Sequence, residues 1–145
     1  MDGGWGVDAL LERQSRAHSD LDLVVPAEQF VAACAALRAE AFEFAREQLP
    51  ASVVFHHPDG REVDIHPAER TADGGGDQYR PDGTGMWHYG PPARGRIDGR
   101  WVTCLSLKTQ LRAHVGYEPD ANDFADMRLL RDELRCELPP PFDRS

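Results

Sequence analysis

Two acidic side chains near the N-terminus have the spacing of a metal-binding pair. Asp20 and Asp22 alternate with Leu21 and Leu23 in residues 20–25, which is the pattern of a strand with one buried face. Side chains two apart on a strand share a face, so the Cα atoms of this pair would lie about 6–7 Å apart. Neighbouring carboxylates repel unless a cation lies between them, and Mg²⁺ prefers such hard oxygen ligands. The pair predicts a Mg²⁺ site, although an isolated Asp-x-Asp is more often a solvated strand face.

A third carboxylate and a glycine pair give further support to the predicted Mg²⁺ site. Asp64 lies between Val63 and Ile65 on a second expected strand, where it can face the same site. Gly3 and Gly4 open a helix, and the backbone N–H groups and positive dipole end of a helix N-terminus bind phosphate. A phosphate cradle, a metal pair and a third carboxylate are what in-line phosphoryl or nucleotidyl transfer needs.

Helices and strands that could position these groups follow from apolar periodicity and turn residues. Besides the strand over 20–25, we expect helices over residues 7–16, 26–40, 106–115 and 121–136. We expect hairpins over residues 52–66, turning at Pro58-Asp59-Gly60, and over residues 96–103, turning at Asp98-Gly99. The segment from residue 67 to about residue 95 is rich in Gly, Pro and Asp, and we expect a long functional or mobile loop there.

Composition restricts the class of protein and its partners. The chain has 145 residues and a net charge of −9, enough for one core and repulsive towards a phosphate backbone. We therefore expect a small or cationic substrate, no nucleic acid and no membrane, and a cytoplasmic location. Cys34, Cys104 and Cys136 have no metal-ligand spacing and are expected to be reduced and buried.

Several histidines and aromatic residues allow a functional and a structural interpretation. His56, His57 and His66 lie near one hairpin, but adjacent strand residues point to opposite faces, so we disfavour a zinc site. His66 is expected to hydrogen-bond Asp64 or to line an acceptor pocket. Trp87 and Tyr89 lie in the expected loop and could stack on a base or sugar.

Other candidates lie outside this region. Trp5 is expected in the core. His114 and Tyr117 are expected in the core or facing a nucleotide, with the core slightly favoured. For Asp123 and Asp126, which are three apart on one helix, the simple interpretation is a helix cap and a solvated surface.

The order of these motifs resembles a known family. Residues 3–11, Gly-Gly-Trp-Gly-Val-Asp-Ala-Leu-Leu, and residues 15–23, Ser-Arg-Ala-His-Ser-Asp-Leu-Asp-Leu, resemble the opening of the antibiotic nucleotidyltransferases. This is the aminoglycoside and lincosamide adenylyltransferase group of the DNA polymerase beta superfamily. Residues 63–67, Val-Asp-Ile-His-Pro, resemble its third-carboxylate strand, and residues 104–130 resemble its C-terminal helical part.

The resemblance implies an α+β fold, with a small mixed β-sheet flanked by helices as in the polymerase-beta-like palm, and C-terminal helices. It implies a single nucleotidyltransferase domain over 1–145, with the palm over about 1–70, a loop and hairpin over about 71–103 and helices over about 104–138. The implied reaction uses Mg²⁺ and a nucleoside triphosphate, with ATP expected. It transfers the nucleoside monophosphate to a hydroxyl of a small cationic molecule, such as an aminoglycoside or lincosamide, and releases pyrophosphate.

The resemblance also assigns roles to residues. Asp20 and Asp22 would hold the metal ions, and Asp64 would be the catalytic base and complete the metal site. Gly3 and Gly4 would bind the triphosphate through their N–H groups, and Ser15, Arg16 and His18 would lie near the phosphates. The family also repeats the acidic pair Asp123 and Asp126, which implies a structural or acceptor-binding role for it.

One departure from the family pattern favours an alternative function. Family members carry a helix and the start of a strand before the glycine pair, whereas here the pair follows Met1 and Asp2. The alternative is a catalytically weak or inactive nucleotide-binding or antitoxin-like module of the same fold. A toxin-type enzyme acting on a protein or RNA hydroxyl is a third and weaker interpretation, and a homodimer is left open.

Overall fold

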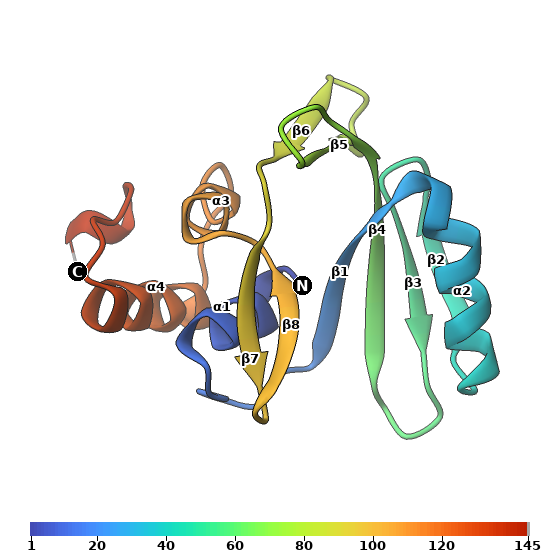
Figure 1. The fold of residues 1–145 in the computed structure, drawn as a ribbon, viewed down its shortest axis with the longest axis horizontal. Helices are drawn as coiled ribbons and strands as arrows, with labels where there is room; N and C mark the ends of the chain where they lie inside the picture. The colour runs from blue at the N-terminus through green and yellow to red at the C-terminus, as the bar shows by residue number, and fades with distance from the viewer. Residues whose placement is uncertain (145) are drawn as a thin grey trace.

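A six-stranded mixed sheet and a separate hairpin form the β-structure of the computed structural model, which describes residues 1–144 (Figure 1). The sheet strands are β1 (Asp20–Pro26), β2 (Glu43–Gln48), β3 (Ser52–His56), β4 (Glu62–Arg70), β5 (Gly76–Tyr79) and β6 (Met86–Tyr89). Their order is β2-β3-β4-β5-β6, with β1 paired in parallel to β4. The hairpin joins β7 (Ala93–Ile97) to β8 (Arg100–Cys104). The observed architecture is the expected α+β fold.

Four α-helices accompany these strands: α1 (Gly3–Leu11), α2 (Phe30–Ala39), α3 (Leu107–Ala113) and α4 (Ala121–Leu134). A short 3-10 turn over Ala27–Gln29 leads into α2, and another covers Phe142–Arg144. Within the described residues, no helix has both the length and the apolar character to cross a membrane.

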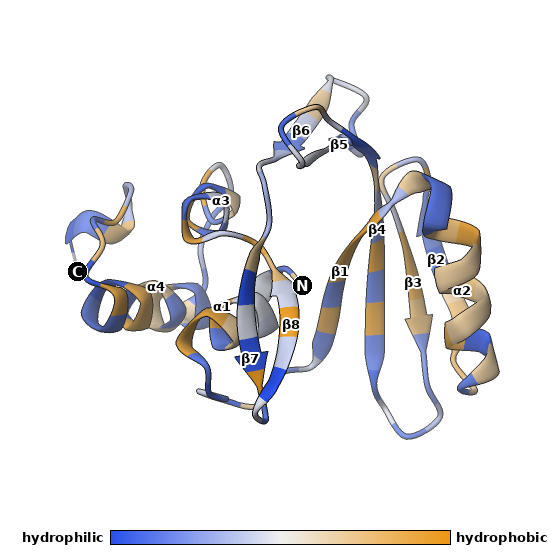
Figure 2. Ribbon diagram, in the orientation of Figure 1, coloured by the Kyte–Doolittle hydropathy of each residue, from blue (hydrophilic) through white to orange (hydrophobic). Residues whose placement is uncertain are grey.

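Alternation along the central strands gives the sheet one apolar and one polar face. Val63 and Ile65 of β4 are buried in a core that α2 covers with Phe30 and Leu37. Figure 2 shows orange and blue alternating along β4, as a strand with one buried face requires. Asp64 therefore projects from the face opposite α2.

A second core joins the remaining helices beside the polar face of the sheet. Val7 of α1 packs with Met127 and Leu130 of α4 and with Phe142, and all four are fully buried. The β7–β8 hairpin packs on α1 and crosses in front of it in Figure 1, and the Asp2 N–H at the start of α1 donates to the Asp22 carbonyl of β1 at 3.0 Å. The polar face of β1 and β4 thus meets the N-terminal end of α1.

Several boundaries differ from the sequence predictions. Helix α1 covers Gly3–Leu11 rather than residues 7–16, because Asp2 caps it and Glu12 ends it in the left-handed conformation. The expected loop over 67–95 is largely sheet, because β4 extends to Arg70 and is followed by β5, β6 and the start of β7. Strand β2 was not predicted, since all its residues are exposed and it lacks an alternating pattern.

The cysteines also differ partly from expectation. All three are free, as expected, and Cys104 is buried, but Cys34 and Cys136 are only half-buried. Both lie at the margins of apolar clusters, Cys34 within α2 and Cys136 after α4.

Candidate active site

Asp22 and Asp64 form the centre of the candidate site. Parallel pairing of β1 and β4 places them directly opposite each other in register. Both project from the face that α2 does not cover, and His66 follows on the same face of β4. Asp22, Asp64 and His66 each bring one potential ligand atom within 4.8 Å of the others. The structure therefore brings together two of the three predicted carboxylates.

Buried neighbours fix the orientation of His66. Gln78 donates one Nε2 hydrogen to the Ala51 carbonyl at 2.7 Å and the other to His66 Nδ1 at 3.0 Å. The Gln78 Oε1 accepts the Tyr89 hydroxyl at 2.6 Å, which sets the amide orientation. Since Nδ1 accepts, the imidazole hydrogen lies on Nε2, which is 3.5 Å from Asp22 Oδ1 and 3.7 Å from Asp64 Oδ2. His66 therefore donates towards the carboxylate pair.

Partial burial and neighbouring charges shift the pKa values of Asp64 and His66. Burial raises the pKa of Asp64, His66 lowers it, and the nearby charge of Asp22 raises it again, so that the net shift is upward. Burial lowers the pKa of His66, but the hydrogen bond with Asp22 and the charge of Asp64 raise it more. A divalent cation between the carboxylates would remove this cost of burial and repulsion.

The donor atoms suit Mg²⁺. Asp22 and Asp64 supply hard oxygen atoms, and Oδ1 of Asp64 is buried without a hydrogen-bond partner among the described residues. Because Nε2 of His66 carries a hydrogen, the carboxylate oxygens and not the imidazole are the fitting ligands. These two residues could therefore hold the ion, with His66 Nε2 facing them at 3.5 and 3.7 Å.

The N-terminus of α1 lies against this pair. Gly3 has a φ of +57°, and a Cβ at this position would lie 2.5 Å from Asp22 Oδ2. Asp2 caps the helix, since its carboxylate accepts the Gly3 N–H at 2.7 Å. Burial raises the pKa of Asp2, the Gly3 N–H lowers it and Asp22 raises it, with a net upward shift. The glycine pair thus brings a helix end into contact with the carboxylate site.

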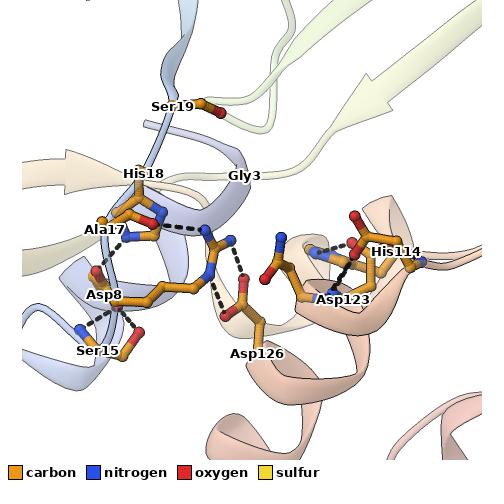
Figure 3. A network of polar contacts seen from close by, with 12 residues as sticks. Gly3, Asp8, Ser15, Ala17, His18, Ser19, His114, Asp123 and Asp126 are labelled. Atoms are coloured by element: carbon orange, nitrogen blue, oxygen red, sulfur yellow. Dashed lines mark hydrogen bonds and ion pairs between the residues drawn. The ribbon is translucent and has the colours of Figure 1, made fainter.

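Arg16 and His18 lie next to Gly4 at the same helix end, and Figure 3 shows His18 above Asp8. A Cβ on Gly4 would lie 2.5 Å from both Arg16 Nη2 and His18 Nδ1. Arg16 binds Asp126 through Nε at 3.1 Å and Nη2 at 2.8 Å, and His18 Nε2 lies 2.5 Å from Asp8 Oδ2. Both predicted phosphate-site residues therefore lie next to the glycine pair.

Two other predicted site residues have different surroundings. Asp20 is exposed at the start of β1, accepts the Ser19 hydroxyl at 3.0 Å and is not part of the Asp22–Asp64–His66 cluster. The Ser15 hydroxyl and N–H both donate to Asp8, at 2.5 and 3.0 Å. A metal role for Asp20 and a nucleotide role for Ser15 stay predictions.

The aromatic residues expected in a loop lie on β6. Tyr89 is 7% exposed, packs with Ala68 and Leu105 and donates its hydroxyl to Gln78. Trp87 is half-buried, lies edge-on to Tyr89 and carries the Arg112 guanidinium 4.9 Å from its ring centroid. Stacking by Trp87 or Tyr89 on a base or sugar stays a prediction.

Three further interpretations are corrected. Trp5 is half-buried and packs on His18, with ring centroids 4.6 Å apart, because the core side of α1 is occupied by smaller residues. Asp126 is 2% exposed and ion-paired, so a solvated surface was wrong. His114 is buried and its Nδ1 bonds the Gln110 carbonyl, as the core interpretation expected, whereas the Tyr117 hydroxyl donates to Asp123 at the surface.

Two polar residues beside the site, Asp8 and Gln78, were given no role from the sequence. Asp8 is on the apolar side of a short helix, and this position of a charged group was the available signal. Gln78 gave no such signal, since its partners Ala51, His66 and Tyr89 lie in other segments.

Comparison with known proteins agrees with this geometry. The profile of the aminoglycoside-2''-adenylyltransferase family matches residues 1–130. The chain belongs to the aminoglycoside-2''-adenylyltransferase family. A lincosamide resistance protein of Staphylococcus haemolyticus is 28% identical over 132 residues, which are 90% of this chain and 82% of that protein. The sequence resemblance to antibiotic nucleotidyltransferases is confirmed.

Solved structures related to this family share the fold. The crystal structure of the lincosamide antibiotic adenylyltransferase LnuA with bound lincomycin has a TM-score of 0.77 and 28% identity, covering 90% of this chain and 83% of LnuA. The crystal structure of ANT(2'')-Ia in complex with adenylyl-2''-tobramycin has a TM-score of 0.68 and 21% identity, covering 92% of this chain and 77% of that one. The nucleotidyltransferase fold prediction is confirmed.

Proposed function

We propose that this protein is a Mg²⁺-dependent adenylyltransferase that transfers AMP from ATP to a hydroxyl of a small cationic antibiotic. The observation that carries the proposal is the Asp22–Asp64 pair in contact with the N-terminus of α1. A carboxylate pair that suits Mg²⁺, beside a helix end that suits phosphate, is the arrangement used for nucleotidyl transfer. The family and the 28% identity to a lincosamide resistance protein support it.

In the proposed reaction the acceptor hydroxyl oxygen attacks the α-phosphorus of ATP. The bond from that phosphorus to the bridging oxygen of pyrophosphate breaks, pyrophosphate leaves with the electron pair, and Asp64 accepts the hydroxyl proton. Asp22 and Asp64, with Asp20 as a third predicted ligand, would hold Mg²⁺, which neutralises the charge that develops on the phosphate oxygens. His66 keeps Asp22 and Asp64 oriented by donating towards them.

The proposed acceptor is a lincosamide or an aminoglycoside, with lincomycin tested first. LnuA was crystallised with lincomycin and has the higher identity and TM-score, whereas ANT(2'')-Ia, crystallised with an adenylylated tobramycin, has 21% identity. A net charge of −9 attracts either cationic antibiotic, and added salt weakens that attraction. A homodimer and a cytoplasmic location stay predictions.

The test is AMP transfer from radiolabelled ATP to lincomycin and to tobramycin with the Asp22→Asn and Asp64→Asn variants. Each substitution keeps the size of the side chain and removes a charge and a metal ligand, so we expect transfer to fall by at least about 100-fold. Glu47→Gln is the matched control, an equivalent change on exposed strand β2, and should transfer at the normal rate. Undiminished transfer by both aspartate variants would refute the proposed function.

A second candidate function is supported by one observation. The Asp2 carboxylate bonds the first N–H of α1, the group that a phosphate at this helix end would use. A site blocked in this way fits a module that binds nucleotide weakly or without turnover. Titration calorimetry with ATP and Mg²⁺, together with the transfer assay, separates the two, because the module predicts a binding isotherm without adenylylated product.

A further inference from the structure

We propose that Asp8 and Asp126 are positioning residues that hold His18 and Arg16 against the N-terminus of α1, so that a triphosphate chain meets two side chains already oriented towards it. The inference rests on the proposed function, because it takes the nucleotide as the ligand of that helix end. Neither carboxylate reaches the Asp22–Asp64 pair, and neither belongs to the metal cluster among the described residues. Their burial nevertheless needs an explanation.

Both carboxylates are enclosed, with Asp8 0% and Asp126 2% exposed. An ionised carboxylate is costly to bury unless it is paired and hydrogen-bonded. Asp8 bonds Ser15 and His18, and Asp126 bonds Arg16 twice, so each carboxylate holds one basic side chain from residues 16–18, just before β1. The two carboxylates come from different helices, α1 and α4, and support opposite sides of that segment (Figure 3).

Asp8 anchors His18 and the chain that leads to it. Its Oδ1 accepts the Ser15 N–H and hydroxyl, and its Oδ2 is 2.5 Å from His18 Nε2. The His18 side chain is only 2% exposed and lies against Trp5. With one ring nitrogen bonded to Asp8 and one ring face covered, the other nitrogen, Nδ1, is directed at Gly4.

Asp126 anchors Arg16 in the same way. Two parallel bonds from Nε and Nη2 fix the plane of the guanidinium, and Nη1 donates to the Ala17 carbonyl at 3.2 Å. A guanidinium has five N–H groups, so one hydrogen on each terminal nitrogen is not used by these bonds. Nη2 is directed at Gly4, and thus one of these hydrogens lies next to the helix end.

The two supports converge on one backbone position. Arg16 Nη2 and His18 Nδ1 both lie 2.5 Å from the point where a Gly4 side chain would begin. On the adjoining residue, Gly3, the corresponding point lies 2.5 Å from Asp22. The α1 N-terminus is therefore flanked by Arg16 and His18 at Gly4 and by the carboxylate pair at Gly3, which matches an anionic chain with a metal-bound end.

The test is the binding of inorganic tripolyphosphate to the full chain without metal, measured by calorimetry, together with kcat and KM for ATP. For Asp126→Asn and Asp8→Asn we expect roughly tenfold or larger increases in the tripolyphosphate Kd and in the KM for ATP, the effect of losing one charge-assisted contact. The KM for the acceptor and kcat should change much less. Asp132→Asn, an equivalent change at an exposed position on α4, is the matched control and should bind normally.

Two further measurements separate positioning from a loss of folding. The double variant Arg16→Gln, Asp126→Asn should bind tripolyphosphate no more weakly than Arg16→Gln alone, because Asp126 acts through Arg16. Gly4→Ala should also weaken binding, since its methyl group displaces both the Arg16 and the His18 side chain while the helix itself accepts alanine. Additive losses in the double variant, or normal binding by Gly4→Ala, would overturn the inference.

The outcomes also distinguish this inference from the proposed function. Normal AMP transfer with unaltered tripolyphosphate binding in Asp8→Asn and Asp126→Asn rejects the positioning role and leaves the proposed function intact. Binding that depends on Asp126, without transfer to lincomycin or tobramycin, rejects the proposed function and supports the positioning role. A wild-type chain that does not bind tripolyphosphate at all rejects the positioning role.

Discussion

At the residue scale, the candidate site depends on two glycines, Gly3 and Gly4, which have no side chain. Because Gly3 has no Cβ, the Asp22 carboxylate approaches to 2.5 Å from the point where one would be. Because Gly4 has none, the basic side chains of Arg16 and His18 approach it equally closely. Any larger residue would separate the groups that meet there. The glycines therefore contribute by permitting close approach, as well as by presenting backbone N–H groups to an anion.

Substituting Gly3 by alanine should damage both the fold and the site. The φ of +57° disfavours alanine by about 1 kcal/mol or more, and the new methyl group would collide with Asp22 Oδ2. We expect a lower free energy of unfolding in urea and a loss of AMP transfer of at least about tenfold, since Asp22 must move.

Gly99→Ala provides the control for this prediction. Gly99 has a φ of +72° but no atom within 4 Å of its Cβ position, so the variant has the strain without the collision. We expect a comparable loss of stability with normal transfer. A Gly3→Ala variant that retains full transfer would show that Asp22 does not depend on this contact.

The carboxylates of the site could be predicted from the sequence, but their supports could not. Asp22 and Asp64 alternate with apolar residues on strands, so their face and proximity follow from local pattern. Asp8 and Asp126 are paired with residues that only the tertiary fold brings near, and Arg16 and Asp126 are 110 positions apart. The sequence therefore predicted a solvated position for Asp126, which the tertiary fold buries.

At the element scale, the site depends on how closely the β7–β8 hairpin packs on α1. Gly95 lies at the contact, where a Cβ would be 2.1 Å from the Ala9 carbonyl oxygen and 3.0 Å from the Ala9 side chain. The hairpin packs on α1, and the N-terminus of α1 contacts the carboxylate pair. Separation of the two elements would shift that helix end.

Gly95→Ala should therefore be strongly destabilising. Its methyl group meets backbone, which cannot rotate away, so we expect a loss of about 2–3 kcal/mol in the free energy of unfolding by urea. Gly90→Ala is the control, since only the Thr109 Oγ1 lies near its Cβ position, at 3.4 Å, and a loss below about 1 kcal/mol is expected. Equal stability of the two variants would contradict close packing at Gly95.

Elements with a clear apolar pattern or turn signal could be predicted, whereas those held by pairing could not. The hairpin at Asp98-Gly99 has positive φ at both turn residues, as its sequence suggests. Strands β5 and β6 each have four residues and join the sheet through β4. Their segment is rich in glycine, so local propensity indicated a loop and only tertiary pairing made it sheet.

At the scale of the whole molecule, the candidate site lies where two cores meet. One core joins the sheet to α2, and the other joins α1 to α4. Asp22 and Asp64 belong to the first half, and the helix end with Arg16 and His18 belongs to the second. At the boundary between the two cores, the acidic side chains of Asp22 and Asp64 lie close together, and they contribute to the net charge of −9.

This concentration of charge should lower stability when the metal is absent. Burial and Asp22 raise the pKa of Asp64 in the fold, although His66 and Arg46 lower it. A carboxyl whose pKa is raised by folding stabilises the folded state while protonated, and this contribution is lost as pH rises through the raised pKa. At neutral pH, the ionised Asp64 therefore opposes folding.

Asp64→Asn should consequently raise the melting temperature in metal-free buffer at pH 7.5, by about 3 °C for each kcal/mol regained. The gain should shrink as pH falls below the raised pKa of Asp64, because the wild-type carboxyl is then neutral too. Adding Mg²⁺ should raise the melting temperature of the wild type, since binding to the folded state alone stabilises it, and should have little effect on the variant. Glu47→Gln, two strands from β4 and in register with the core residues Val53 and Ile65 rather than with Asp64, should respond to metal as the wild type does. If Asp64→Asn melts below the wild type without metal at pH 7.5, the pair is not a destabilised anionic site, and the case for a cation between Asp22 and Asp64 loses its electrostatic basis.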